Sequence, residues 1–255
     1  MENTQIQKRT IAQFLNVPST QKFLEETLSD KKGEFISNLI AITDSDENLA
    51  ACDPAKLMKC AMNATALNLP LNKNLGYAYV IAYKAVPSFQ IGYKGYIQLA
   101  LRTGQYEFLN AVEVREGELI RNKITGEIKF LGEKPENKVV GYIAYLKLRS
   151  GFQASIYMTE AEIEAHAVRF SKSYAYDLKN KTMSSKWSDP LARPKMALKT
   201  VLKGLLGTYG LMTTELAKAF DSDDNSENEI GQRVVEDAEI IPQSEPTETP
   251  KKVKI

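Results

Sequence analysis

The sequence has few of the residues on which metal sites, disulfide frameworks and hydrolytic triads depend. Among its 255 residues are two cysteines, Cys52 and Cys60, and a single histidine, His166. Two cysteines are too few for a disulfide framework, and with one histidine they cannot complete a four-ligand zinc site. No serine or cysteine motif accompanies His166, so we interpret it as a core or helix-surface residue. This cysteine usage favours a reducing cytosol.

Long apolar runs and nucleotide-binding motifs are also missing. The longest apolar stretches, such as residues 78–82, fall far short of the roughly 20 residues that a membrane span needs. The N-terminus is polar and mixed in charge, and we expect neither a span nor a secretory signal. The sequence has no G-x-x-x-x-G-K-[ST] loop and no G-x-G-x-x-G turn between a strand and a helix. These absences argue against ATP-driven chemistry.

What the sequence does have is the composition of a globular protein and an uneven charge. It is 43% hydrophobic and 25% charged, which suffices for a core in one or two domains. The net charge of +1 hides an asymmetry: residues 221–255 carry ten acidic and four basic side chains, −6, which leaves +7 on residues 1–220. A basic body suits a polyanion, and an acidic tail suits shielding or a second partner. A tail that merely solubilises the protein is the alternative.

The tail begins at Asp221, contains three prolines and lacks aromatic residues. Such a segment cannot bury enough apolar surface to offset the entropy of ordering, so we predict disorder. Its apolar cluster is a short linear motif or a chance grouping, and consists of Val234, Val235, Ile240 and Ile241. We divide the chain into an N-terminal helical region, an α+β core and this tail, over residues 1–50, 51–220 and 221–255.

Hydrophobic periodicity predicts helices first, then strands, then helices again. Helices are expected over residues 20–28 and 34–42 and from Asp53 and Pro54, a residue pair that caps and begins a helix. After Pro70 the period changes to two. The strands expected from that pattern form three hairpins or pairs: one within residues 77–91, one around residues 125–126, and one joining residues 139–148 to 152–158, with a further strand at 108–114.

Helices are also expected over residues 93–102 and, after a capping box at Thr159 and Glu162, to residue 168. Residues 169–188 show no clear period and are expected to form a loop. Two final helices follow, from about Pro194 to before Gly207 and over residues 213–220. This order indicates an α+β fold with a central antiparallel β-sheet and packed helices.

Three segments combine basic, aromatic and amide side chains. Single-stranded nucleic acid requires this combination: cations for phosphates, flat groups for bases and amides for polar edges. The first segment, residues 68–83, places Lys73 in a polar turn before Tyr77 and a tyrosine-rich strand. Tyrosines on a strand are also typical of half-buried side chains, so the turn is the stronger candidate.

The second segment, residues 90–106, carries Gln90, Tyr93, Lys94 and Arg102. Tyr93 and Lys94 stand between two glycines where a strand meets a helix. Glycines permit close backbone approach, and a helix N-terminus directs N–H groups and partial positive charge outward, which suits a phosphate. A plain tight turn is the alternative reading.

The third segment, residues 187–206, includes Trp187 and Arg193. On its helix Lys195, Lys199 and Lys203 recur at i, i+4 and i+8 without an acidic partner at i,i+4, which favours neutralisation by a polyanion over a merely solvated face. Just upstream, Lys172 and Lys186 lie among aromatic residues, which is typical both of a mobile lid over a bound strand and of an ordinary surface loop.

A cluster of carboxylates after the expected strand at 108–114 is the one enzymatic candidate. Glu113, Glu116 and Glu118 could in principle bind Mg²⁺ for a nuclease, but no D-x-D pattern accompanies them. The nuclease interpretation and that of an adaptor acting through the acidic tail remain alternatives to strand binding.

The same segments resemble the RecT family of phage and prophage single-strand annealing proteins. The resemblance runs from about residue 20 to 220 and rests on residues 67–70 and 75–79, 90–95, 99–104, and Trp187 with Met196 and residues 199–202. The turn at residues 85–88 is uncharged where a basic or polar loop is expected, and the tail matches nothing in the family.

The resemblance implies a protein that is not an enzyme, needs neither ATP nor a cofactor, and uses Mg²⁺ only as an aid to annealing. Such proteins coat single-stranded DNA as oligomers or helical filaments and pair it with a complementary strand, through a basic groove formed by sheet and helices. The expected partners are a second copy, single-stranded DNA, the annealed duplex, a phage exonuclease and, for the acidic tail, the host single-strand binding protein. No membrane partner is expected, and the location is the cytoplasm of a bacterial host. The expected DNA-binding residues are Lys73, Tyr77, Gln90, Tyr93, Lys94, Arg102, Lys172, Lys186, Trp187, Arg193, Lys195, Lys199 and Lys203.

Overall fold

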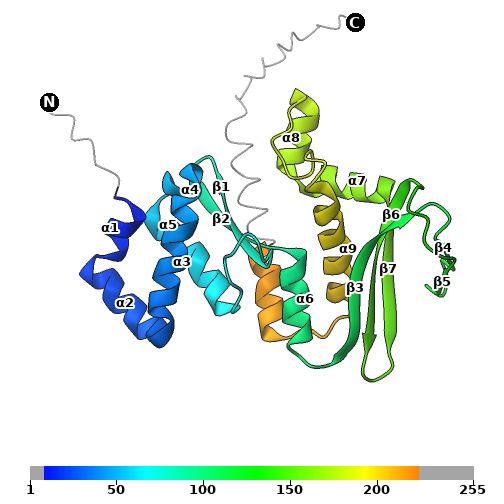
Figure 1. The fold of residues 1–255 in the computed structure, drawn as a ribbon, viewed down its shortest axis with the longest axis horizontal. Helices are drawn as coiled ribbons and strands as arrows, with labels where there is room; N and C mark the ends of the chain where they lie inside the picture. The colour runs from blue at the N-terminus through cyan, green and yellow to red at the C-terminus, as the bar shows by residue number, and fades with distance from the viewer. Residues whose placement is uncertain (1–8, 224–255) are drawn as a thin grey trace, which may run out of the picture.

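The computed structural model describes residues 9–223, which form an elongated α+β molecule (Figure 1). A group of helices lies at one end and a small β-hairpin, β4–β5, at the other. Between them a three-stranded sheet is covered by helices. The apolar cluster expected in the tail lies outside the described residues.

The helical end consists of short helices joined by tight turns. These are α1 (Ile11–Leu15), α2 (Pro18–Leu28), the 3₁₀ turn η1 (Ser29–Lys31), α3 (Lys32–Asp44), α4 (Glu47–Ala50) and α5 (Pro54–Ala66). The Asp53 side chain accepts a hydrogen bond from the Lys56 N–H, and Pro54 occupies the first turn. Both confirm the helix start predicted from this pair of residues.

The strands form three separate antiparallel sheets. β1 (Ala78–Tyr83) pairs with β2 (Val86–Ile91), β4 (Leu119–Arg121) with β5 (Ile128–Phe130), and β3 (Tyr106–Arg115), β6 (Val139–Leu148) and β7 (Gln153–Thr159) form a sheet in the order β3-β6-β7. The predicted strands are therefore present and antiparallel, and they are divided among three sheets, of which β3-β6-β7 is the central one. Helix α6 (Tyr93–Leu101) separates β2 from β3, and β4 and β5 pair only with each other.

The helices that follow the sheet are α7 (Glu160–Phe170), α8 (Lys172–Asn180) and α9 (Arg193–Tyr209). The capping box at Thr159 and Glu162 is confirmed. The loop predicted over residues 169–188 is wrong in its first half, because Ser171 caps α8 by accepting a hydrogen bond from the Tyr174 N–H. A last helix, residues 214–223, runs past residue 220, so the boundary placed before Asp221 does not coincide with its end.

Two clusters of buried apolar side chains stabilise these elements. One lies among the N-terminal helices and includes Leu24, Leu39 and Leu57. The other lies between the three-stranded sheet and its helices and includes Leu146 and Leu202. Helix α5 contributes to both clusters, so the two clusters meet within this helix.

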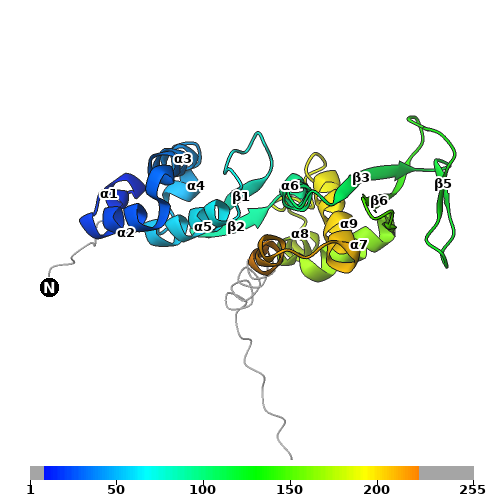
Figure 2. The same ribbon diagram turned by 90° about the horizontal axis from the view of Figure 1, so that it is seen from below.

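Helix α9 packs against one face of the three-stranded sheet, as both ribbon views indicate (Figures 1 and 2). Its buried stripe includes Val201, Leu202 and Leu205, and the facing side chains of β6 include Ala144 and Leu146. Each fully buried leucine of this kind contributes roughly 1.5–3 kcal/mol relative to an exposed position. This contact fixes the direction in which the lysines of α9 project.

Candidate nucleic-acid interface

The three lysines of α9 lie along one side of the helix but differ in burial. Lys195, in the first turn, is exposed. Lys199, one turn further, is only 8% exposed, and Lys203 is partly buried. The predicted spacing is therefore present, but the three ammonium groups do not form one solvated stripe.

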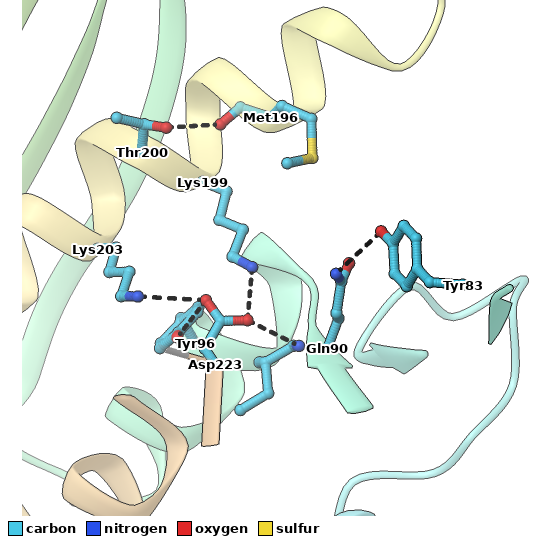
Figure 3. A network of polar contacts seen from close by, with 9 residues as sticks. Tyr83, Gln90, Tyr96, Met196, Lys199, Thr200, Lys203 and Asp223 are labelled. Carbon is cyan, nitrogen blue, oxygen red and sulfur yellow. Dashed lines mark hydrogen bonds and ion pairs between the residues drawn. The ribbon is translucent and has the colours of Figure 1, made fainter. Parts of the chain in front are cut away.

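Lys199 and Lys203 bind a carboxylate from the helix of residues 214–223 (Figure 3). Lys199 Nζ lies 2.7 Å from Asp223 Oδ1, and Lys203 Nζ lies 3.3 Å from Asp223 Oδ2. The Tyr96 hydroxyl donates to Oδ2 at 3.1 Å, and the Ile91 N–H donates to Oδ1 at 3.4 Å. Four donors from α9, α6 and β2 thus converge on one buried anion.

The ionised state of Asp223 follows from these neighbours. Burial by itself would raise the pKa of Asp223, but the charges and hydrogen bonds of Lys199 and Lys203 outweigh it and hold this pKa below its ordinary value. Lys199 and Lys203 have no acidic partner at i,i+4, as the sequence indicates, but they do have one in the folded chain. No partner lies within one helical turn, and the one that tertiary structure supplies is 24 and 20 residues away in sequence.

At the β2–α6 junction, Gly92 and Gly95 allow another part of the chain's own backbone to approach closely. A Cβ at Gly92 would lie 2.2 Å from the Gly76 carbonyl oxygen, and one at Gly95 would lie 2.2 Å from that of Tyr77. The Gly92 N–H donates to the Tyr77 carbonyl at 3.0 Å. Close backbone approach, as predicted, is the reason for both glycines, and the approaching group is the turn before β1.

This tight junction leaves Lys94 exposed at the N-terminus of α6. Tyr93 beside it is half-buried, as is Tyr77, which packs against the main core. Burial, and secondarily the neighbouring Tyr93, raise the pKa of Tyr79. The lysine is therefore the accessible group of this segment, and the tyrosine rings are largely structural.

Three other predicted site residues have internal partners. The Arg102 guanidinium donates to the carbonyls of Leu67 and Asn68, both at 2.7 Å, where α5 ends. Lys73 lies 3.4 Å from the Asp46 carboxylate. The Gln90 side-chain amide donates to the Tyr83 hydroxyl at 3.3 Å within the β1–β2 hairpin (Figure 3). Arg102 thus stabilises the junction between α5 and α6.

The segment after α8 is organised by Asp177. Its carboxylate accepts hydrogen bonds from the hydroxyls of Thr182, Ser184 and Ser188 and from the N–H groups of Ser184 and Ser185. A loop with this many bonds to one buried anion fits an ordinary ordered loop, one of the two interpretations of this segment, better than a mobile lid. Lys186 in this loop and Lys172 at the start of α8 are exposed.

Trp187 and Arg193, which were also predicted to bind DNA, instead contact other residues of the fold near this loop. Trp187 is 5% exposed and packs near Tyr174, with ring centroids 6.4 Å apart, so its indole belongs to the core and is not displayed for stacking. Arg193, at the start of α9, binds Glu160 at 2.6 Å and Glu164 at 3.0 Å. Both carboxylates come from α7, so this arginine ties α9 to α7.

Four predicted cations thus remain exposed and form neither an ion pair nor a side-chain hydrogen bond with any group in residues 9–223: Lys94, Lys172, Lys186 and Lys195. They come from the starts of α6, α8 and α9 and from the loop between α8 and α9. Lysines that are exposed without a carboxylate partner are suited to contacts with phosphates.

The open face of the three-stranded sheet carries side chains that the sequence analysis did not single out. Strand register places Phe108, Tyr145 and Tyr157 on the face away from α9, and Phe108 is 51% exposed. The Phe108 and Tyr145 rings lie 6.0 Å apart, and the Arg121 guanidinium lies 6.0 Å from the Tyr157 ring. Alternation predicts two faces for each strand, but not which face α9 covers.

The carboxylates weighed for a nuclease serve the fold. Glu118 accepts hydrogen bonds from the N–H groups of Arg115 and Lys134, and these bonds lower the pKa of Glu118. Glu113 lies 2.6 Å from Arg115. Across residues 9–223 no three or more His, Cys, Asp or Glu side chains are grouped to hold a metal ion.

His166 is half-buried on α7 and packs on Phe170, with ring centroids 4.6 Å apart. Burial, followed by the charges of Lys203 and Arg169, lowers its pKa. This environment agrees with the interpretation of His166 as a structural histidine. Within the described range, none of the helices has the length and hydropathy required to cross a membrane.

The exposed, unpaired lysines at the starts of α6, α8 and α9 suit an α+β protein that contacts an extended polyanion. Comparison with protein families makes this specific: the RecT family model matches residues 33–238, and the chain belongs to the RecT family. Membership implies single-strand annealing in DNA recombination, and annealing proteins of this kind are generally not catalytic enzymes.

Two relatives support this assignment. The chain is 40% identical over 245 residues to the uncharacterized protein YqaK of Bacillus subtilis, covering 95% of this chain and 82% of that protein. It is 27% identical over 172 residues to protein RecT of Escherichia coli, covering 62% of this chain and 64% of that protein. The chain therefore matches less than two thirds of the Escherichia coli protein.

Proposed function

We propose that the protein binds single-stranded DNA through its phosphates and anneals it to a complementary strand without ATP. The observation that carries the proposal is the family match over residues 33–238, which spans all four exposed lysines. Contacts to phosphate give affinity without sequence preference, and base pairing then selects the partner strand. Pairing also supplies the driving force, roughly 1.4 kcal/mol per base-pair step, so hydrolysis is not required.

We further propose that Lys94, Lys172, Lys186 and Lys195 line a basic groove for the strand. Lys73, Arg102 and Arg193 already have internal partners, and Lys199 and Lys203 bind Asp223. These five side chains stabilise the fold, and each of them contributes to DNA binding only when it separates from its internal partner. The half-buried side chains of Tyr77, Tyr93 and Gln90 lie beneath the same surface and stabilise it.

Assembly and location are part of the same proposal. The protein acts as a homo-oligomer or filament on the strand, with the N-terminal helices between protomers. An exonuclease that produces the single strand and a host single-strand binding protein are its partners, and Mg²⁺ assists annealing without being a cofactor. The site of action is the bacterial cytoplasm, where the phage or prophage DNA recombines.

The test of the groove is the salt dependence of binding for single lysine variants. Lys94→Ala and Lys195→Ala should each weaken binding to unrelated oligonucleotides by a similar factor, and should reduce the slope of log affinity against log salt by about 0.7 for each lost phosphate contact. Lys59→Ala is the matched control, because Lys59 is an exposed lysine on α5. Unchanged affinity and slope in both groove variants would remove these lysines from the interface.

The alternatives give different results in the same samples. A nuclease shortens the labelled strand when Mg²⁺ is present and loses that activity on substitution of Glu113 or Glu118. An adaptor that works through its tail shows no dependence on Lys94 or Lys195.

A further inference from the structure

The buried carboxylate of Asp223 fills a site that is built for an anion. Its two oxygens receive two ammonium groups, one hydroxyl and one backbone N–H, contributed by three different elements (Figure 3). Lys199 and Lys203 supply two positive charges against the single negative charge of Asp223.

This site lies next to the surface that is proposed to bind DNA. Lys199 and Lys203 continue the line begun by the exposed Lys195 on α9 at intervals of four residues. The Ile91 N–H lies three residues before the exposed Lys94, at the β2–α6 junction. An anion held here is thus adjacent in the fold to two of the four lysines assigned to the strand.

A phosphodiester can satisfy the same donors. Like a carboxylate, it carries one negative charge shared between two oxygens that point away from a common atom, and lysine, hydroxyl and backbone N–H groups bind either one. Exchanging one for the other leaves the charge of the site unchanged. The helix that carries Asp223 prevents this exchange, because it holds the carboxylate in the site.

That helix, residues 214–223, packs on the core that contains Leu146 and Leu202 through the apolar side chains of Leu216, Ala219 and Phe220. Leu216 and Ala219 are fully buried, and the Phe220 ring contacts the Tyr96 ring edge-on at 5.3 Å. Lys203 Nζ lies 5.5 Å from the centre of the Phe220 ring. Asp221, two residues before Asp223 on this helix, is exposed. In the sequence, further carboxylates follow Asp223 at positions 224, 227 and 229.

We infer that Asp223 occupies a phosphate-binding site of the protein, formed by the Ile91 N–H, Tyr96, Lys199 and Lys203, and that a DNA phosphate replaces it when the helix of residues 214–223 moves away. The inference rests on the proposed function, because the ligand is the backbone of single-stranded DNA. The helix then competes with DNA for the site, and binding of the full strand requires its release.

The test compares Asp223→Asn with Asp221→Asn in the full chain. Both variants remove one negative charge from the same helix, but only the first removes it from the site. With a labelled 30-residue oligo-dT, which cannot pair with itself, Asp223→Asn should bind at least tenfold more tightly than the wild type at 0.1 M salt. Its salt slope should be steeper by about 0.7, the value for one more phosphate on a single strand. Asp221→Asn should stay within twofold of the wild type.

Equal or weaker binding by a folded Asp223→Asn, relative to Asp221→Asn, overturns the inference while leaving the proposed function intact. Absence of binding by the wild type and by both variants overturns the proposed function and the inference with it. Circular dichroism establishes whether each variant is folded.

Hydrogen exchange on the wild-type chain supplies a measurement that does not depend on a variant. Addition of oligo-dT should increase amide exchange within residues 214–223 while exchange within α6 falls or stays constant. Unchanged or slower exchange in residues 214–223 at saturating oligo-dT shows that the helix stays in place, and contradicts the inference.

Discussion

At the scale of single residues, Asp177 is the group on which the segment between α8 and α9 depends most. It is 2% exposed, and its carboxylate accepts five hydrogen bonds from residues 182–188. Burial would raise the pKa of Asp177, but the bonds from Ser184, Ser188, Thr182 and the Ser185 N–H hold it far below its ordinary value. The ionised carboxylate therefore stabilises the folded state.

Asp177→Asn should lower the free energy of unfolding at pH 7 by about 3 kcal/mol, since an amide nitrogen replaces an oxygen that accepts hydrogen bonds. The pKa of Asp177 is lower in the folded chain than in the unfolded chain, so its contribution is complete above about pH 4 and is lost as the pH falls below that value. The wild type should lose stability more steeply than the variant between about pH 4 and pH 2.

Urea unfolding across this pH range measures both effects. Asp30→Asn, at an exposed position of η1, is the control for loss of an acidic charge and should leave the stability at pH 7 nearly unchanged. Equal stability of Asp177→Asn and Asp30→Asn would show that the five bonds do not hold the segment.

At the scale of secondary-structure elements, the contact between the turn before β1 and the start of α6 decides where Lys94 projects. Gly95 is buried there, and a Cβ at this position would lie 2.2 Å from the Tyr77 carbonyl oxygen and 2.8 Å from Ile91 Cγ2. Both neighbours belong to well-packed backbone or core, so an added methyl group has no space.

Gly95→Ala should therefore destabilise the protein by about 2 kcal/mol through overpacking. Gly204→Ala is the matched control, because Gly204 lies within α9 and its Cβ would meet Ile156 Cδ1 at an ordinary 3.7 Å. Alanine favours a helix by about 1 kcal/mol over glycine, so the control should raise the midpoint of thermal unfolding while Gly95→Ala lowers it. A midpoint for Gly95→Ala at or above that of the wild type would contradict the contact.

The sequence predicted the elements whose signals are local. Caps at Asp53 and Thr159 and the alternation in β1, β2, β6 and β7 identify them because caps and strand periods are properties of neighbouring residues. Helix α8 was missed because its cap, Ser171, directly follows α7 and only Tyr174 and Asp177 of the helix are buried. Because α7 and α8 follow one another so closely, the hydrophobic periodicity of the sequence does not distinguish them.

The candidate site was less predictable because its electrostatics depend on tertiary contacts. Lys195, Lys199 and Lys203 have one spacing and one residue type, yet only Lys195 is exposed. Lys199 and Lys203 differ from Lys195 because they bind the carboxylate of Asp223, a residue that composition assigned to the tail. Trp187 likewise belongs to a basic and aromatic segment in sequence but lies in the core. Exposure and partners come from the fold, which periodicity does not specify.

At the scale of the whole molecule, two apolar clusters meet in α5, and the four lysines proposed for the groove belong to α6, α8, α9 and the loop between α8 and α9. The helical end carries no member of the four-lysine set, and its own charges are partly paired, as between Lys32 and Glu25 at 2.7 Å. DNA binding by the sheet-containing part and protein contacts by the helical end are the division of roles that we propose.

The most direct test of the central claim is annealing of two complementary labelled oligonucleotides in the absence of ATP, with strand lengths checked on a denaturing gel. The account predicts that the protein accelerates pairing, that both strands keep their full length, and that Lys94→Ala slows the reaction while Lys59→Ala does not. Pairing at the spontaneous rate, or strands shortened in the presence of Mg²⁺, would contradict it.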